Sequence, residues 1–435
     1  MSLDPIVKRL LRFLEHSPTP WHATQNMLER LEQAGFRRLH ETQAWELKAG
    51  ERVVVTRNDS SLIALQLPHD PLSALRMIGA HTDSPGLRLK PNAALNAGDW
   101  LQLGVEVYGG ALLAPWFDRD LALAGRVHVR HGDGRLQSLL LDTKHAVAMV
   151  PSLAIHLDRD VNNGRPINPQ TQMAPVLCQG SGKSEAFETL LRTWLEEQHE
   201  LKQADILSFE LCFYDTQPPA VVGVNADLIA SARLDNLLSC FIGMEALLES
   251  DGTQGAVLVA NDHEEVGSAS TSGAQGPFLL DVLRRVVEQL GDSSEQEWSR
   301  LIQSSCMISC DNAHALHPNF SDKHDAAHGP SLNGGPVIKV NANQRYATNS
   351  VTAALFRDVC RDAEVPVQTF VTRADMGCGS TIGPITATEL GVPTLDVGVA
   401  QWAMHSIRET AGSKDAGHLI RALTTFLNRR QLTWD

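Results

Sequence analysis

Four short apolar runs end in clusters of polar residues and lack the 3.6-residue period of a helix. They are Arg76–His81, Ala256–Glu265, Cys306–Asp311 and Pro393–Val399. Continuous apolar runs of this length are typical of strands that are covered on both faces of a sheet. We therefore predict four central strands of one sheet, with a site at the strand ends, where such sheets bind ligands.

Helical segments alternate with these strands. Asp281–Leu290 and His418–Arg429 have a helical pattern. A further helix opens at Asp4-Pro5, and its apolar face is formed by Ile6, Leu10, Phe13 and Leu14. This alternation predicts an α/β fold in which the sheet is the middle of three α/β/α layers.

The pattern changes between about Asn92 and Asp227. Short β-like runs punctuated by glycine, such as Trp100–Tyr108 and Gly125–His131, replace the alternation of helices and strands. We predict an inserted, mostly β domain over residues 92–227. The domain that carries the site is then discontinuous and comprises residues 1–91 and 228–435, as expected where an insertion occupies a loop.

Composition narrows the class of protein. The chain has 435 residues, of which 43% are apolar and 20% are charged, as in a soluble protein of two domains. Its net charge of -14 argues against nucleic acid or an anionic membrane as a partner. Charged residues interrupt the N-terminal apolar positions, so we expect neither a signal peptide nor a membrane span. Seven cysteines without a C-x-x-C pair favour the reducing cytoplasm.

The adjacent carboxylates of Glu264 and Glu265 follow the second apolar run. They repel each other and are costly near a buried strand end unless a cation neutralises them. Because neighbouring residues leave a strand on opposite sides, one carboxylate can bind metal while the other accepts a proton from water. A solvated acidic turn is the alternative interpretation.

Four other residues complete a candidate metal site. His81 is followed by Asp83, which can accept the imidazole N–H and thereby fix the tautomer that binds metal. Asp235 precedes an apolar helical run, where it is either an ordinary N-cap or a carboxylate that bridges two cations. Asp311 and His405 add one ligand each, unless they are surface residues. Two dications, three ligand carboxylates and one hydroxide sum to about zero charge, which makes a buried site tolerable.

Six segments resemble the aspartyl aminopeptidase family of cytosolic di-zinc exopeptidases: GAHTDSPGLRLKP, ARLDNLLSCF, NDHEEVGS, ISCDNAHALHPNF, GGPVIKVNANQRYATN and MHSIRE. The similarity runs through nearly the whole chain in the family's order. It implies two zinc ions per subunit, with His81 and Asp311 on one, Glu265 and His405 on the other, Asp235 between them, Glu264 as catalytic base and Asp83 orienting His81.

The resemblance also implies how the chain assembles and what it cleaves. The inserted β domain would mediate dimerisation within a dodecamer, and His156 would complete the active site of a neighbouring subunit. The expected substrates are peptides with an acidic N-terminal residue, whose side chain needs a cation such as Lys339 or Arg345, with Met404 lining the same pocket. Without the family, Lys339 and Arg345 are more typical of solvated strand residues. Met404 is equally typical of core packing, and the alternative for His156 is a buried or surface histidine.

Three alternatives stay open at this point. A broader aminopeptidase or a deacylase could use the same two-metal site, and manganese or cobalt could replace zinc on nitrogen and oxygen ligands. A different class is a nucleotide-binding assembly protein, because Gly180–Ser184 resembles the end of a phosphate-binding loop. That loop would need its first glycine at Leu177, so we expect no nucleotide site.

Overall fold

The computed structural model describes residues 3–180, 184–199, 201, 205–291 and 293–432. The chain divides into two compact units, the first made of Met1–Asp83, Pro219–Met404 and Glu409–Asp435, and the second of Ser84–Pro218 and His405–Arg408. These bounds differ from the predicted insertion at residues 92–227. The reason is strand pairing, because β5 (Gly86–Ala97) belongs to a sheet of the second unit and β11 (Ala220–Val222) to a sheet of the first.

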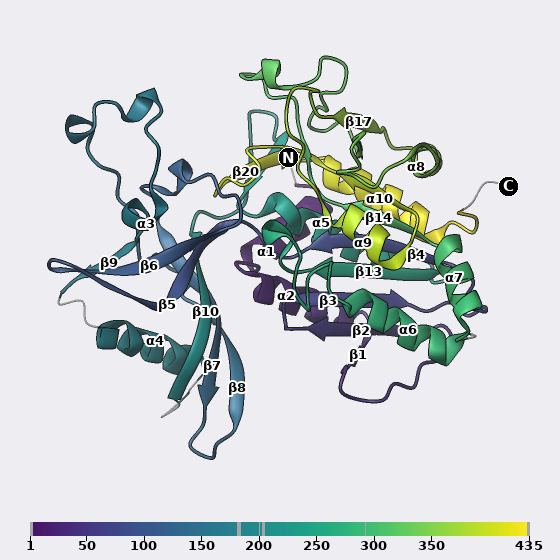
Figure 1. Ribbon diagram of the computed structural model, residues 1–435, viewed down its shortest axis with the longest axis horizontal. Coiled ribbons are helices and arrows are strands. Elements are labelled where there is room, and N and C mark those ends of the chain that lie inside the picture. The colour runs from purple at the N-terminus through teal and green to yellow at the C-terminus, as the bar shows by residue number, and fades with distance from the viewer. Residues whose placement is uncertain (1–2, 181–183, 200, 202–204, 292, 433–435) are drawn as a thin grey trace. The chain divides into compact units, whose positions relative to one another are not determined.

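A nine-stranded sheet forms the middle of the first unit (Figure 1). Its strands lie in the order β1 (Arg37–Leu39), β2 (Arg52–Arg57), β3 (Ser61–Gln66), β13 (Gly255–Asn261), β4 (Leu75–His81), β14 (Cys306–Cys310), β18 (Thr394–Gly398), β16 (Val337–Val340) and β17 (Gln368–Val371). The four neighbours β13, β4, β14 and β18 run parallel, so their carboxyl ends meet at one edge. These four contain the predicted central strands.

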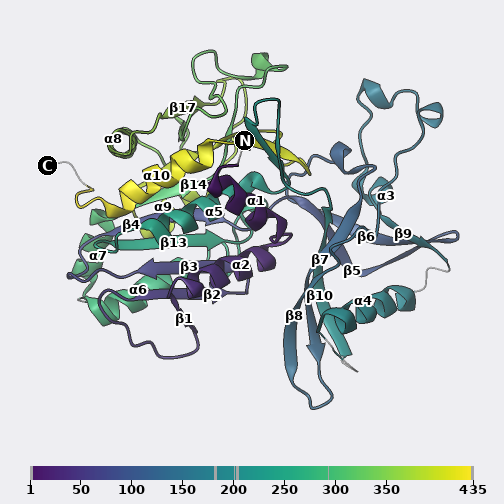
Figure 2. The same cartoon turned by 180° about the vertical axis from the view of Figure 1, so that it is seen from behind.

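Helices cover both faces of this sheet. Alternate residues of β13 enter different clusters: Leu258 packs with one and Val257 with the other, which is why both faces of the run are apolar. One cluster contains side chains of α1 (Pro5–Glu15), α2 (Pro20–Gln33), α5 (Leu234–Glu249), α8 (Ser350–Asp362) and α10 (Asp415–Asn428). The other contains side chains of α6 (Phe278–Leu290), α7 (Glu295–Ser304) and α9 (Ile382–Leu390). In Figure 2, α1, α2, α5 and α10 lie in front of the sheet. In Figure 1, which views the opposite face, α6, α7 and α9 lie in front of it. The predicted α/β fold is therefore confirmed.

A second, five-stranded sheet belongs to the first unit. Its order is β11 (Ala220–Val222), β12 (Leu228–Ser231), β20 (Glu409–Gly412), β19 (Ala400–Trp402) and β15 (Ala313–His314). In β20, Glu409 pairs with Ser231 of β12, three residues before α5 begins. Among the described residues, no helix is long and apolar enough to cross a membrane.

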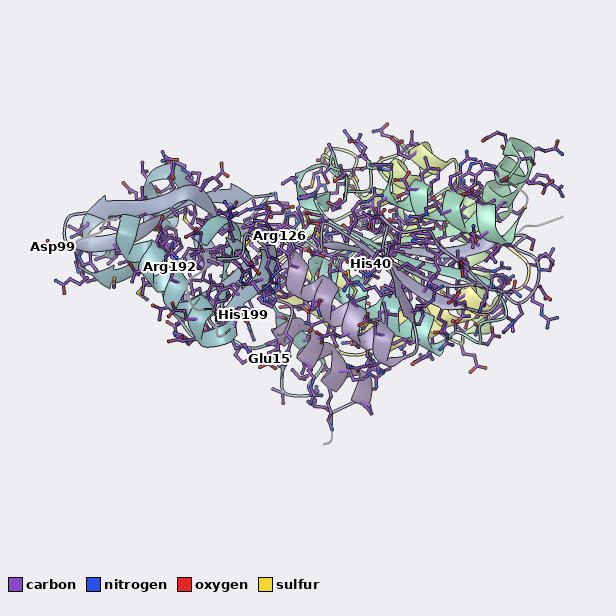
Figure 3. All side chains as sticks on the ribbon, turned by 90° about the horizontal axis from the view of Figure 1, so that it is seen from below. Glu15, His40, Asp99, Arg126, Arg192 and His199 are labelled. Atoms are coloured by element: carbon purple, nitrogen blue, oxygen red, sulfur yellow. The ribbon has the colours of Figure 1, made fainter. Side chains whose placement is uncertain are left out.

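The second unit is built on a six-stranded antiparallel sheet. Its strands lie in the order β8 (Leu136–Asp142), β7 (Leu121–Arg130), β10 (Asp205–Asp215), β5 (Gly86–Ala97), β6 (Trp100–Tyr108) and β9 (Val176–Gln179), with helices α3 (Pro169–Gln172) and α4 (Ser184–His199). Arg126, labelled in Figure 3, donates from Nε to Glu210 Oε2 at 2.5 Å, and Arg88 pairs with the other oxygen of that carboxylate. Two cations thus satisfy one carboxylate within the sheet.

A buried carboxyl at the start of α10 makes stability depend on pH. Asp415 accepts the N–H groups of Asn333 and Gly335 at 2.6 and 2.9 Å, yet burial raises its pKa from 3.8 to about 6. A raised carboxyl pKa gives stability that is complete below pH 3.8 and is lost as the pH rises through 6.

The Asp415→Asn variant cannot ionise at this position. Between low and neutral pH we therefore expect its free energy of unfolding to fall by about 3 kcal/mol less than that of the wild-type protein. Urea unfolding of both proteins between pH 4 and 7 measures the difference, and parallel pH profiles would contradict it.

Candidate metal centre

His81, the last residue of β4, lies buried among carboxylates. Its Nε2 atom is 3.4 Å from Asp235 Oδ1, 3.8 Å from Asp311 Oδ1 and 4.0 Å from Glu264 Oε2. One ligand atom from each of His81, Asp235 and Glu265 lies within 4.8 Å of the other two. One imidazole and four carboxylates therefore meet at the carboxyl edge of the parallel strands.

The pairing of the strands explains this meeting. Asn261 of β13 lies beside His81, so the chain that leaves β13 passes the imidazole at once. His263 then adopts a left-handed backbone conformation with φ of 65°, and Glu264–Val266 forms a short 3-10 helix. The apolar run predicts the glutamate pair on the strand itself, with side chains on opposite sides. This prediction is wrong, because the strand ends at Asn261.

Asp83 organises the two neighbouring segments. Its backbone carbonyl oxygen is 3.1 Å and its Oδ1 atom 3.3 Å from His81 Nδ1, and its carboxylate accepts the backbone N–H groups of Glu264 and Glu265, both at 3.1 Å. A proton on Nδ1 directed at these Asp83 oxygens leaves Nε2 as the lone-pair nitrogen of a neutral imidazole. Asp83 therefore directs Nε2 of His81 toward Asp235 and Asp311. In metal sites, a carboxylate that does not itself bind the metal commonly orients a histidine ligand in this way.

The electrostatics of this cluster fit a cation. Burial, followed by the charge of Asp235, raises the pKa of Glu265 well above its usual value. Burial raises the pKa of Glu264 to about 7, and the charges of Asp311 and Asp235 add to the effect. Burial opposes the charged form of His81, but the surrounding carboxylates raise its pKa well above normal. Nitrogen and oxygen donors at such spacing suit zinc, whose charge would let these carboxylates ionise together.

Asp235 is held by a residue that sequence reasoning did not single out. Asp235 and Asn236 have non-helical backbone angles, so α5 is interrupted at Asp235. The Asp235 N–H donates to Glu409 Oε2 at 2.8 Å. Glu409 is 1% exposed, and it reaches Asp235 because β20 pairs with β12. Its position at the end of the segment MHSIRE was the available signal, but no local pattern predicts that contact.

Lys339 of β16 contacts another residue of the cluster. It is 2% exposed, so the solvated interpretation is wrong for this lysine. Its Nζ atom donates to Asp311 Oδ2 at 3.1 Å and to the carbonyl of Asn312 at 3.2 Å, and it lies 4.9 Å from the ring centre of Tyr346. Arg345, in the loop after β16, is exposed.

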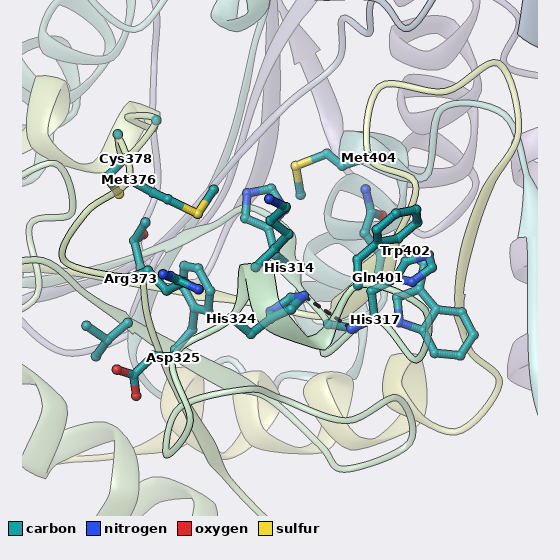
Figure 4. A pocket seen from close by; sticks show the side chains of 18 of the residues that line it. His314, His317, His324, Asp325, Arg373, Met376, Cys378, Gln401, Trp402 and Met404 are labelled. Carbon is teal, nitrogen blue, oxygen red and sulfur yellow. Dashed lines mark hydrogen bonds between the residues drawn. The ribbon is translucent and has the colours of Figure 1, made fainter. Parts of the chain in front are cut away.

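A pocket of about 320 Å³ is lined in part by Tyr346 and is shown in Figure 4. His314, Trp402 and Met404 contribute to its walls together with Tyr346, and Figure 4 shows Met404 at its upper rim. The backbone N–H of His317 donates to His324 Nε2 at 3.1 Å, marked by the dashed line. Met404 therefore lines a pocket rather than the core.

Two predicted site residues belong to the second unit. His156 lies on a short 3-10 helix, Ile155–Leu157, and is exposed. His405 directs Nδ1 at the carbonyl oxygen of Gly110, 3.1 Å away, which makes Nε2 the lone-pair nitrogen when Nδ1 donates. The roles of these two histidines in the metal centre stay predictions.

Comparison with known proteins identifies the family. The family described as "Aminopeptidase I zinc metalloprotease (M18)" matches residues 13–427. The chain belongs to the M18 family of zinc aminopeptidases. It is 57% identical to "Probable M18 family aminopeptidase 2" of Pseudomonas aeruginosa strain UCBPP-PA14, over 97% of this chain and 98% of that protein. The protein of the same name from Azotobacter vinelandii is also 57% identical, with 96% of each chain covered. The protein is accordingly a metallohydrolase.

Solved M18 structures share its fold. The structure titled "Cryo-EM structure of the Ape4 and Nbr1 complex" has a TM-score of 0.94 and 37% identity, and covers 98% of this chain and 88% of that one. The structure of the S. cerevisiae mApe1 dodecamer has a TM-score of 0.84 and 26% identity, with 97% and 96% covered. The M18 aminopeptidase fold therefore extends over nearly the whole chain.

Proposed function

We propose that this aminopeptidase releases aspartate or glutamate from the N-terminus of peptides. Two zinc ions would be held by His81, Asp235, Glu265, Asp311 and His405. The convergence of the first four around His81 Nε2 supports this set, and manganese or cobalt would suit the same donors. Asp235 has two carboxylate oxygens and would bridge the ions.

Each residue has a defined task in this proposal. When bound, zinc polarises the scissile carbonyl and lowers the pKa of a bound water. Glu264 accepts the proton of the attacking water and delivers it to the amine of the leaving peptide. Asp83 holds the imidazole of His81 and the backbone of Glu264, so it couples the position of a ligand to the position of the base.

One observation carries the preference for acidic residues: a buried lysine beside the metal ligands. Lys339 has three N–H donors, and among the described residues two of them are directed at Asp311 and Asn312. The third is available for the side-chain carboxylate of a substrate. Such a bond, made by a desolvated ammonium, discriminates strongly against a neutral side chain.

We further propose a homo-oligomer in which dimers assemble into a dodecamer. The S. cerevisiae relative is titled a dodecamer, and this chain matches it over 97% of its length. Exposed apolar residues flank His156, with Leu153 at 52%, Ile155 at 45% and Leu157 at 75% exposure, which supports an interface at this segment. His156 would then serve the neighbouring active site.

We also propose a cytoplasmic location. The seven cysteines are all free, in keeping with the cytoplasm.

A scan of chromogenic aminoacyl substrates tests the acidic preference. We expect kcat/KM for aspartyl and glutamyl substrates to exceed that for alanyl and leucyl substrates by about 100-fold or more, because a neutral side chain leaves the third N–H of the buried ammonium without an acceptor. Acetylation of the substrate amine should abolish cleavage, which separates an aminopeptidase from a deacylase. Faster hydrolysis of alanyl or leucyl substrates would establish the broader-specificity alternative.

The nucleotide-binding alternative depends on the Gly180–Ser184 segment. Ser181, Gly182 and Lys183 of the Gly180–Ser184 segment lie outside the described residues. Calorimetric titration with ATP distinguishes the two classes, and we expect no heat of binding.

A further inference from the structure

A second buried carboxylate lies behind Lys339. Asp396 is in the middle of β18 and is 0% exposed. In the sheet it pairs with Ser309 of β14 on one side and with Lys339 of β16 on the other. Residues directly opposite each other on adjacent strands have side chains on the same face, about 5 Å apart at Cβ. Strand register therefore places the Asp396 carboxylate beside the Lys339 side chain.

The Asp396 side chain is tightly held. The hydroxyl of Thr381, the N-cap of α9, donates to Oδ1 at 2.6 Å, and the N–H of Ala347 donates to Oδ2 at 2.7 Å. A Cβ atom on Gly383 would lie 2.4 Å from Oδ1, so the first turn of α9 packs directly on the carboxylate. Asp396 thus joins β18, α9 and the loop after β16.

Asp396 and Asp311 act on Lys339 from two directions. Burial disfavours the charged amine, but the charges of Asp311 and Asp396 raise the pKa of Lys339 above its usual value. Burial also raises the pKa of Asp396, and the charge of Lys339 opposes that rise. When Asp311 is occupied as a metal ligand, the charge of Asp396 still favours the charged form of Lys339.

The same carboxylate holds the pocket wall. Its hydrogen bond to Ala347 fixes the residue after Tyr346, and the N–H of Asp396 donates to the hydroxyl of Thr348 at 2.9 Å. Tyr346 lines the pocket and lies against Lys339 Nζ. A change at Asp396 therefore displaces the ammonium and the ring together.

We propose that Asp396 is a positioning residue that holds Lys339 and Tyr346 in the geometry that selects an acidic N-terminal residue. This inference rests on the proposed preference for acidic substrates. Asp396 does not touch the substrate, and its effect is transmitted through Lys339 and the 346–348 loop. It should therefore alter selectivity without altering metal content.

The test compares aspartyl and alanyl chromogenic substrates with Asp396→Asn, a substitution of nearly equal shape. We expect the ratio of the two kcat/KM values to fall by about tenfold or more, through a higher KM for the aspartyl substrate. Zinc content and kcat/KM for the alanyl substrate should stay near the wild-type values. Asp415→Asn is the matched control, because it removes another buried carboxyl whose hydrogen bonds are made to Asn333 and Gly335, and it should leave the ratio unchanged.

The outcomes separate the two proposals. A wild-type enzyme without aspartyl preference would refute the proposed function and, with it, this inference. A wild-type enzyme that prefers aspartyl substrates, with equal losses on both substrates in Asp396→Asn or an unchanged ratio, would refute the inference alone. If Asp396→Asn does not fold, Thr381→Val removes one hydrogen bond to the carboxylate and keeps its charge. A smaller fall in the same ratio is then expected, and an unchanged ratio overturns the inference.

Discussion

Glu264→Gln is expected to reduce kcat by about 10²- to 10⁴-fold, the usual contribution of a general acid–base group, while zinc content stays at the wild-type level. Glutamine preserves the shape of the side chain but cannot accept the proton of the attacking water. The Glu264 carboxylate reaches to 4.0 Å from His81 Nε2, so it stands at the edge of the ligand cluster.

The measurement pairs steady-state kinetics with elemental analysis of the same protein sample. Glu389→Gln is a suitable control, since Glu389 is an exposed carboxylate on α9 of the same unit, and it should keep full activity. Near-normal kcat in a zinc-loaded Glu264→Gln enzyme would exclude Glu264 as the base. Loss of zinc together with activity would instead make Glu264 a ligand.

Removal of zinc with a chelator is expected to have the second large effect. Turnover should fall by about 10³-fold or more, because the metal supplies several kcal/mol of transition-state stabilisation. At pH 8 the melting temperature should also fall, by about 5 °C or more, since a ligand bound at many times its Kd stabilises the fold by several kcal/mol. Without a cation, the carboxylates around His81 repel one another.

This destabilisation has a defined pH dependence. The pKa of Glu264 is raised from 4.5 to about 7, so in the zinc-free protein its contribution to stability is complete below pH 4.5 and is lost as the pH rises through 7. The zinc-free protein should therefore melt at a lower temperature at pH 8 than at pH 5.5. The zinc-free Glu264→Gln variant should show a shallower slope, because glutamine does not ionise. Equal slopes in the two zinc-free proteins would show that Glu264 is not responsible, and zinc addition should restore both stability and turnover.

The bounds of the two units show where local pattern stops being informative. Near Asn92 the sequence pattern changes from alternating helices and strands to short β-like runs separated by glycine. However, β5 already begins at Gly86, and its pairing with β6 and β10 assigns it to the second unit. Residues 405–408 also belong to that unit, and the packing of Ile407 with its hydrophobic cluster accounts for this. A four-residue segment has no composition that could predict such packing.

The sequence by itself determined the central strands and the polar residues that follow them. A run such as residues 256–260 is apolar throughout because alternate side chains pack on opposite faces, and this signal is local. The tertiary structure alone decided what Lys339, Glu409 and Asp396 do. Each acts across a strand pair or a helix start that is remote in sequence, as Lys339 pairs with Asp396 and Glu409 reaches Asp235. A buried charge gains its function from the partner that register places beside it, and register between distant strands is not written in either strand alone.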